Sequence, residues 1–271
     1  MSYQVRTFQS APHQLSSANK NLSICLKPDG FSFTISTDNN HLLTYCDVQA
    51  DTRASISALS ADIKALFADK QLSTFGYSRA ELIVQTELST WIPEHLFEKG
   101  KERQYLALVG SIKQGNSVFA DINPLIKSYI VFEAPSTATS AFKIVFPGIS
   151  IRCQHSKFVT QQLLSEAPTC LLVHLRKGTF DIMASSNSTL QLTNSFPFNN
   201  LSEAIYRTLS VVKMLNLESS DLQLNLCGDV DRDSYRQYQR YFPHVKLYTG
   251  ILMPQSDEMA PIHTYKDILV F

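Results

Sequence analysis

Glycine is scarce in this sequence. The chain has 9 glycines in 271 residues, below the usual share of about 7%, and it contains neither an adjacent glycine pair nor a GxG triplet. Loops that cradle phosphate with backbone N–H groups depend on such glycines. Residues 110–117 have the GxxxxG spacing of a P-loop, but Asn116 stands where that loop needs lysine. We therefore interpret residues 110–117 as a surface loop before a strand.

The sequence also lacks net charge, a long apolar run and a secretory signal. Lysine plus arginine and aspartate plus glutamate both total 24, so the whole chain has no field that would draw it to nucleic acid or an anionic membrane. No stretch approaches the roughly 18 apolar residues of a membrane span, and residues 1–20 lack the apolar core of a signal peptide. We therefore expect a cytoplasmic protein without a membrane span, with residues 1–20 as a flexible N-terminus.

The cysteines do not fit a disulfide framework, because they are odd in number and widely spaced. The five are Cys25, Cys46, Cys153, Cys170 and Cys227. Most lie within apolar runs, which predicts buried free thiols and a reducing compartment. Cys153 and His155 could supply two metal ligands, but no CxxC or HxxxH pair elsewhere completes a tetrahedral set. We expect no metal site.

The length of 271 residues exceeds the usual single-domain size, so two cores or two repeats are expected. Residues 21–48 alternate apolar and polar positions at period two, with turns at residues 28–30 and 38–40, which predicts a meander of three strands. Apolar residues then recur at helical spacing after an N-cap at Asp51 or Thr52. Residues 80–88 are expected to follow as a strand.

The same order of elements returns in the second part of the chain. A shift of 149 positions superposes both turns and pairs residues of like kind: Leu22 with Leu171, Ile24 with Val173, Leu26 with Leu175, Phe31 with Phe180 and Phe33 with Ile182. A period of this length indicates a duplicated domain. We therefore predict an α/β protein with two βββαβα-type halves, residues 21–165 with an inserted α+β segment and residues 166–271.

The stretch between the two meanders predicts the elements of that insertion and the passage to the second half. We expect a loop and a short helix over residues 90–110, strands over 117–122 and 127–134, a helix over 136–146, a strand over 148–154, and a helix over 155–166. The last of these helices leads into the second half.

Three strands followed by helix, strand, helix and strand, present twice, are typical of the duplicated ribonuclease-H-like fold of actin, the sugar kinases and the Hsp70 chaperones. Four stretches of the second half read VHLRKGTFDIM, LQLTNSFPF, LSEAIYRTLSVVKMLNL and LNLCGDVDRDS. With them the chain resembles a family of uncharacterised Bacteroidota proteins grouped as domain of unknown function 3822. The resemblance implies an actin-like ATPase fold, distantly similar to the pilus assembly protein PilM and the division protein FtsA, and no established activity.

ATPases of this superfamily hold the nucleotide with two hairpin turns and a Gly-Gly turn, and an aspartate at each hairpin orients Mg. The resemblance places the corresponding residues of this chain at three turns: Asp29 with Gly30, Gly178 with Thr179, and Gly228 with Asp229. The turns are altered, because Pro28 removes an N–H donor and His174 and Arg176 stand where aspartate and glycine are expected.

We therefore predict a non-catalytic interaction or scaffold module with an unidentified protein partner and no catalytic residues. The alternative is a divergent protein that binds ATP and Mg through the six turn residues, Asp29, Gly30, Gly178, Thr179, Gly228 and Asp229.

Two other features suggest further chemistry. His174, Arg176 and Asp181 share one predicted hairpin and could meet as a base with its orienting carboxylate, although cross-strand polar pairs are also ordinary structure. Trp91 follows a predicted strand. An exposed tryptophan there would mark a binding hot spot, but we expect burial under the adjacent helix.

Residues 234–248 interleave aromatic with basic side chains. Arg236, Arg240 and Lys246 suit contact with nucleic acid, so a nucleic-acid-associated accessory protein is a second alternative. Helical spacing favours the core for the aromatic residues of one face: Tyr235, Tyr238 and Phe242.

Overall fold

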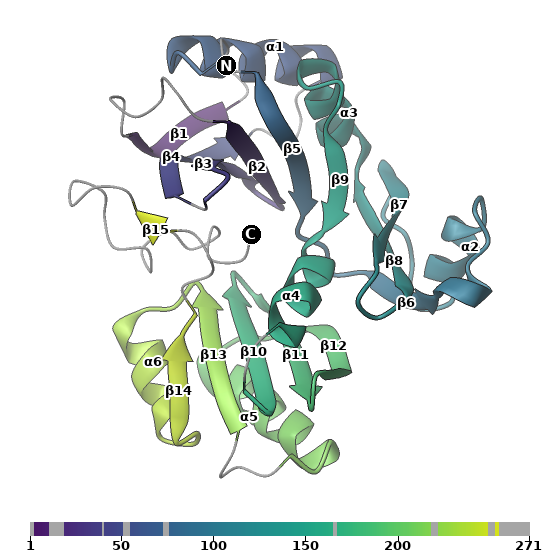
Figure 1. The fold of residues 1–271 in the computed structure, drawn as a ribbon, viewed down its shortest axis with the longest axis vertical. Coiled ribbons are helices and arrows are strands. Elements are labelled where there is room, and N and C mark those ends of the chain that lie inside the picture. Colours follow the sequence, from purple (N-terminus) through teal and green to yellow (C-terminus); the bar gives the residue numbers. More distant parts are fainter. Residues whose placement is uncertain are drawn as a thin grey trace.

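The computed structural model describes residues 3–10, 19–39, 41–50, 55–72, 76–164, 167–217, 222–248 and 253–254. They form two α/β halves, one above the other in Figure 1, and a small third sheet beside them. None of the described helices is long and apolar enough to span a membrane.

The upper half is built on a seven-stranded sheet in the order β1-β4-β3-β2-β5-β9, with β15 also paired to β4. Its elements are β1 (Tyr3–Ser10), β2 (Lys20–Lys27), β3 (Gly30–Thr37), β4 (His41–Ala50), α1 (Ile56–Asp69), β5 (Tyr77–Val84), α3 (Ser136–Val145), β9 (Ser150–Cys153) and β15 (Met253–Pro254). The predicted meander is confirmed as the antiparallel strands β2, β3 and β4. Strands β5 and β9 extend it in parallel.

Both ends of the chain differ from the sequence-based boundaries. The expected flexible N-terminus is wrong for β1, which pairs antiparallel with β4. Strand β15 was assigned to the second half, but it pairs in parallel with β4 at His41 and Leu42. Pairing at a sheet edge uses backbone groups of any sequence, so the polar N-terminal segment and the short β15 gave no recognisable pattern.

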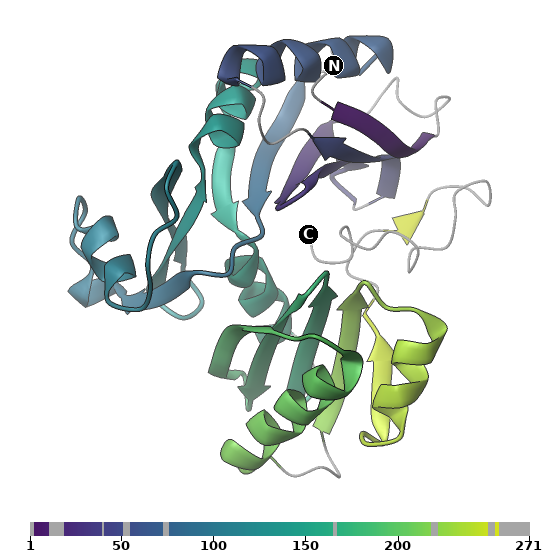
Figure 2. The same cartoon turned by 180° about the vertical axis from the view of Figure 1, so that it is seen from behind.

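The lower half repeats the arrangement of the upper one (Figure 2). Its elements are β10 (Thr169–Arg176), β11 (Thr179–Ser186), β12 (Thr189–Pro197), α5 (Leu201–Met214), β13 (Leu222–Gly228), α6 (Arg232–Gln239) and β14 (His244–Leu247). The strand order β12-β11-β10-β13-β14 matches β4-β3-β2-β5-β9. The fold prediction is confirmed, with two βββαβα-type halves.

The inserted segment forms a three-stranded sheet in the order β6-β8-β7. Its elements are β6 (Ser89–Pro93), the 3-10 helix η2 (Glu94–Leu96), α2 (Glu102–Ala107), β7 (Asn116–Asn123) and β8 (Ser128–Pro135). The expected loop from residue 90 is wrong, because β6 pairs antiparallel with β8. Helix α4 (Gln154–Leu163) then links β9 to the lower half.

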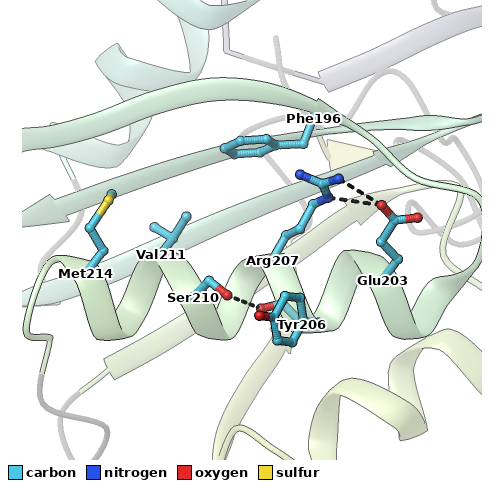
Figure 3. A pocket seen from close by; sticks show the side chains of 7 residues that line it. All are labelled: Phe196, Glu203, Tyr206, Arg207, Ser210, Val211 and Met214. Carbon is cyan, nitrogen blue, oxygen red and sulfur yellow. Dashed lines mark hydrogen bonds and ion pairs between the residues drawn. The ribbon is translucent and has the colours of Figure 1, made fainter.

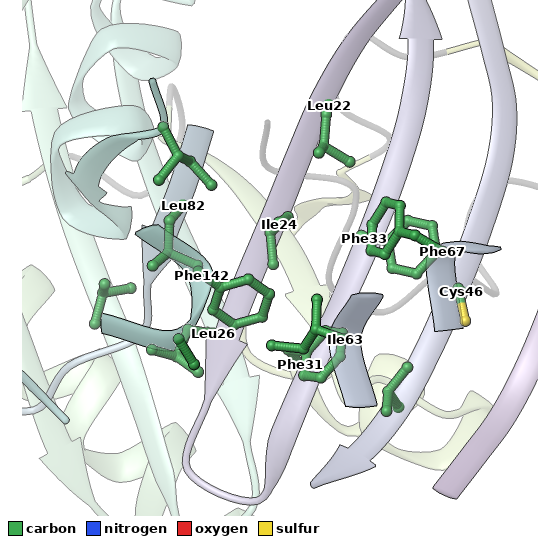
Figure 4. Packing of buried hydrophobic residues seen from close by; sticks show 14 of the residues in the cluster. Leu22, Ile24, Leu26, Phe31, Phe33, Cys46, Ile63, Phe67, Leu82 and Phe142 are labelled. Carbon is green, nitrogen blue, oxygen red and sulfur yellow. The ribbon is translucent and has the colours of Figure 1, made fainter. Parts of the chain in front are cut away.

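The core of the upper half lies between the sheet and the helices α1 and α3 (Figure 4). Phe31 meets Phe142 of α3 edge-on at 5.1 Å between ring centroids. Phe33 stacks on Phe67 of α1 at 4.7 Å. Alternate residues of β2 and β3 supply this layer, so the period-two pattern of the sequence corresponds to one buried face.

The start of α1 lies later than the predicted cap. The N-cap is Ser55, whose Oγ accepts a hydrogen bond from the N–H of Ala58 at 3.2 Å. Asp51 and Thr52 lie outside the described residues.

We expect Ser55→Ala to lower the free energy of unfolding by about 1 kcal/mol, because one N–H of the first turn loses its acceptor. The matched variant Lys64→Ala replaces an exposed residue inside the helix, where alanine is the better helix former, and should cost nothing. Urea denaturation followed by circular dichroism measures both. Equal losses would show that Ser55 does not cap α1.

Candidate functional site

The parallel strands of both halves end toward one another. The arrowheads of β5 and β9 in the upper half point down, and those of β10 and β13 in the lower half point up (Figure 1). Ligands of open α/β sheets bind outside such strand ends. This region is therefore where the residues of a nucleotide site are expected.

The structure brings four of the six turn residues together at the edge of the lower sheet. Gly178 and Thr179 form and follow the β10–β11 turn, and Gly228 lies beside Leu175 in the parallel register of β10 and β13. The N–H of Asp229 donates to the carbonyl of Leu175 at 2.8 Å. Asp29 and Gly30 occupy the corresponding turn between β2 and β3 of the upper sheet.

Gly228 is required by internal packing. Its φ is +85°, a left-handed conformation, and a Cβ there would lie 2.1 Å from the carbonyl oxygen of Leu175 and 2.7 Å from Cδ2 of His174. The next N–H groups are used within the turn, since Val230 donates to the carbonyl of Gly228 at 2.8 Å. Close approach of two chain segments therefore explains this glycine without a ligand.

A buried carboxylate, Asp181 of β11, is the centre of a polar cluster beneath the second hairpin. Five side chains lie within hydrogen-bonding distance of its oxygens: Gln154 (2.5 Å), Ser195 (2.6 Å), Arg176 (2.7 Å), His174 (3.0 Å) and His155 (3.2 Å). We call these six residues the Asp181 cluster. Asp181 itself is 2% exposed, so the cluster is part of the interior.

The charges of the cluster balance around Asp181. Burial by itself would raise the pKa of Asp181, but the Arg176 guanidinium and the hydrogen bonds from His155 and His174 hold that pKa well below its usual value. Asp181 is therefore a carboxylate paired with Arg176. Three polar atoms of the cluster have no partner within the described residues: Arg176 Nε, His174 Nε2 and Gln154 Oε1.

The geometry of the cluster resembles a nucleophile beside a base. Ser195 Oγ lies 3.3 Å from His155 Nε2, and Ser89 Oγ lies 3.1 Å from His155 Nδ1. However, Ser195 donates its proton to Asp181 at 2.6 Å, and His155 is only 2% exposed. Because the Ser195 proton is directed to Asp181 and not to His155, Ser195 is not arranged as a nucleophile in this conformation.

Sequence reasoning found part of this cluster. The predicted approach of His174, Arg176 and Asp181 is confirmed, because His174 and Asp181 are direct cross-strand partners. Gln154, His155 and Ser195 were missed, since they come from α4 and β12. The available signal was the run of polar residues that begins α4 immediately after the buried Cys153.

Helix α4 is held by all three sheets. The Asp121 carboxylate of β7 accepts from the N–H of Cys153 at 3.0 Å and lies 2.8 Å from Arg152. Burial raises the pKa of Asp121 despite Arg152. Asn123 donates to the carbonyl of Ser156 at 3.0 Å. The start of α4 is therefore fixed to the inserted sheet as well as to the Asp181 cluster.

The charged side chains of the first hairpin are also paired. Lys27 Nζ lies 2.5 Å from an Asp47 oxygen, and Arg6 lies 3.5 Å from Asp29. These residues do not fit ATP and Mg as the ATPases of this fold hold them, because His174 stands where the second carboxylate is expected and the oxygens of Asp181 are already bonded.

The other candidate residues lie apart from this region. Tyr238 and Phe242 are buried, as the helical spacing predicts, and Tyr235 Oη donates to the carbonyl of Val245 at 3.1 Å. Arg236 and Arg240 are exposed. Lys246 is exposed on β14, where its Nζ donates to Gln223 at 3.1 Å.

Cys153 and His155, the two residues that could have supplied metal ligands, are engaged otherwise. Cys153 is fully buried, which raises the pKa of its thiol, and His155 belongs to the Asp181 cluster. The described residues contain no group of three potential ligands that could hold a metal ion.

A groove of about 480 Å³ lies on the outer face of α5 (Figure 3). Arg207 pairs with Glu203 at 2.8 Å and lies over the ring of Phe196, 5.8 Å from its centroid. Tyr206 and Met214 are 70% and 62% exposed beside them. The groove is shallow and mostly apolar, and its two charges neutralise each other.

Two similar halves with strand ends that face one another define a protein of the actin-like ATPase fold. The chain belongs to the family described as protein of unknown function (DUF3822), whose model matches residues 10–245.

Solved structures share the fold over most of the chain. A protein of actin-like ATPase fold and unknown function from Bacteroides thetaiotaomicron superposes with a TM-score of 0.69 and 21% identity, covering 84% of this chain and 90% of that chain. The ethanolamine utilization protein EutJ from Carboxydothermus hydrogenoformans gives 0.53 and 8%, covering 94% and 88%. A chain of the PilM-PilN type IV pilus biogenesis complex gives 0.52 and 8%, covering 92% and 95%. No curated protein sequence matches the chain.

Proposed function

We propose that this chain is a non-catalytic interaction module on the actin-like ATPase fold. The observation that carries the proposal is the Asp181 cluster. In it, the positions that would grip phosphate and Mg at the second hairpin carry His174 and Arg176, and both side chains are bonded to a buried carboxylate. Side chains committed to internal pairs are costly to withdraw for a ligand.

Several features support an interaction role. Helix α4 joins the three sheets through buried polar contacts, which suits a framework that presents surfaces in fixed relation. One protein of this fold was solved as the PilM-PilN complex, so the fold can serve binding to another protein. We also propose a cytoplasmic location for the protein, because its described cysteines are buried and none is joined in a disulfide, which suits a reducing compartment.

Isothermal titration calorimetry of the full chain with ATP or ADP in the presence of Mg tests the proposal. We expect no saturable heat at millimolar nucleotide, because the turn residues offer neither a free carboxylate pair nor glycine-rich N–H groups.

A saturable heat would overturn the proposal if Gly178→Trp abolished it, since the bulky ring at the β10–β11 turn blocks the space between the halves. The variant Gly100→Trp is the matched control, because Gly100 also has a positive φ and open surroundings but lies in the inserted segment. Binding lost in Gly178→Trp and kept in Gly100→Trp would support the divergent ATP-binding alternative.

A further inference from the structure

A second groove, of about 530 Å³, lies between the start of β12 and the inserted sheet. Residues 188–193 line it from the lower half, and Trp91, Leu125, Ile126 and Ser128 line it from the insertion. Both views place β12 at the outer edge of the lower half, next to the inserted sheet (Figures 1 and 2). We call it the β12 groove.

The strand along this groove is an unprotected sheet edge. β12 ends the order β12-β11-β10-β13-β14, and its nine residues, Thr189–Pro197, include no charged side chain. Three other edge strands carry a charge, Arg6 in β1, Asp121 in β7 and Lys246 in β14, whereas the five-residue edge strand β6 has none and ends in Pro93. Charged residues on an edge normally prevent pairing with another chain. β12 lacks that protection where it lines the groove.

The backbone of β12 has hydrogen-bonding capacity outside the sheet. Its ladder to β11 shifts register between Leu190 and Leu192, so Gln191 has no counterpart on β11. The outer N–H and C=O groups of an edge strand point away from its only neighbour. An added strand would pair with these groups.

Two buried polar atoms of the groove also lack partners. Trp91 Nε1 and Thr193 Oγ1 have no hydrogen bond within the described residues. A buried N–H without an acceptor costs free energy, which an incoming carbonyl would relieve once the groove opens around it. No residue that lines the groove is charged, so a segment without charges suits it.

We propose that the β12 groove binds an extended, uncharged segment of another protein by strand addition to β12. At about 3.3 Å per residue, the lining stretch 188–193 accommodates roughly six residues of such a segment. Alternate aliphatic side chains would contact Trp91, Leu125 and Ile126. Trp91, Leu125, Ile126 and Ser128 of the insertion form the wall of the groove opposite β12, so the incoming strand would lie between β12 and these side chains.

This inference names a surface for the proposed interaction role and rests on that role. The two remain separable by experiment. Nucleotide binding between the halves would overturn the proposed function but would not test the groove. Peptide binding at β12 tests the groove alone.

The test is selection of random peptides of about seven residues, displayed on phage, against the full chain. We expect enrichment of uncharged sequences rich in aliphatic and β-branched residues. A synthetic copy of an enriched peptide should bind at least about tenfold more weakly to Thr189→Lys and to Gln191→Lys, which place a charge on exposed positions of the edge. Leu247→Lys, on the opposite edge strand β14, should bind as the unaltered protein does.

Hydrogen exchange locates the bound peptide independently of the variants. Amides of residues 189–193 should exchange more slowly with peptide present. The proposal is overturned by charged consensus peptides, by equal binding to all three variants, or by no enrichment. A concentration-dependent dimer that Thr189→Lys and Gln191→Lys abolish would assign the groove to a second copy and likewise overturn it.

Discussion

Asp181→Asn is expected to lower the free energy of unfolding by about 3 to 5 kcal/mol, the usual cost of breaking a buried ion pair from one side. The change keeps the shape of the side chain but leaves the Arg176 guanidinium without its carboxylate. It also turns one oxygen, which accepts hydrogen bonds, into an N–H₂ group, which can only donate. That new donor would lie against another donor, either Gln154 at one position or Arg176 and Ser195 at the other. Urea denaturation at neutral pH measures the loss.

The ion pair between Lys27 of β2 and Asp47 of β4 in the upper half is the comparison. Asp47→Asn removes the partner of Lys27, whose side chain is 12% exposed, and should cost about 1 kcal/mol because water still reaches the pair. If Asp181→Asn does not fold, Ser195→Ala is the second variant: it removes one hydrogen bond to Asp181, leaves the ion pair with Arg176 intact, and should fold with a loss of about 1.5 to 3 kcal/mol. Equal costs for Asp181→Asn and Asp47→Asn would refute a central role for the cluster.

The same pair gives the stability a pH dependence of known sign. The pKa of Asp181 in the folded protein is held well below its usual value of about 3.9. Its contribution is therefore complete above about pH 4 and is lost as the pH falls toward the folded pKa. The difference in unfolding free energy between the unaltered protein and Asp181→Asn should narrow as the pH falls below about 4.

Gly228→Ala is the second substitution with a large expected effect. The added methyl group would lie 2.1 Å from the Leu175 carbonyl, in a residue with φ of +85°. The left-handed conformation costs about 1 to 2 kcal/mol for an L-residue, and overpacking adds about 1 to 3 kcal/mol. We therefore expect a loss of roughly 2 to 5 kcal/mol in the same denaturation experiment.

Gly178→Ala separates the two contributions. Gly178 has φ of +75°, but a Cβ there would meet nothing within 4 Å. It should cost only the conformational part, about 1 to 2 kcal/mol. A loss at Gly228 no greater than that at Gly178 would mean that β10 and β13 relax apart without penalty, and the packing explanation for Gly228 would fail.

The regular part of the fold was predictable because both halves bury alternating residues. The shift of 149 positions places β2 on β10 and β3 on β11 residue for residue, Lys20 on Thr169 and Gly30 on Thr179. Buried hairpins leave a period-two pattern and a turn signal in the sequence. The edge elements β1, β6 and β15 left no such signal, because they depend on backbone pairing with a neighbour.

The candidate site was predictable only within one hairpin. His174, Arg176 and Asp181 are brought together by the register of β10 and β11, which follows from the position of the turn. Ser195 is the cross-strand partner of Asp181 in the next pairing, that of β11 with β12. His155 reaches Asp181 through the packing of α4 against the lower sheet, a tertiary contact that no local spacing in the sequence indicates. The role of Gly228 was likewise missed, since the close approach to Leu175 comes from parallel pairing of β10 and β13.

The outer edge of β4 receives strands from both ends of the described chain, β1 at residues 44–50 and β15 at His41 and Leu42. Met253 and His41 are more than 200 residues apart in sequence. Because closing so long a loop lowers the conformational entropy of the chain before the contact stabilises it, this pairing should form late in folding. It also returns the chain, after the last strand of the lower half, to the sheet of the upper half. Together with α4, it gives the halves a second connection, which is attached to the upper sheet by strand pairing, and we expect the halves to unfold as one cooperative unit.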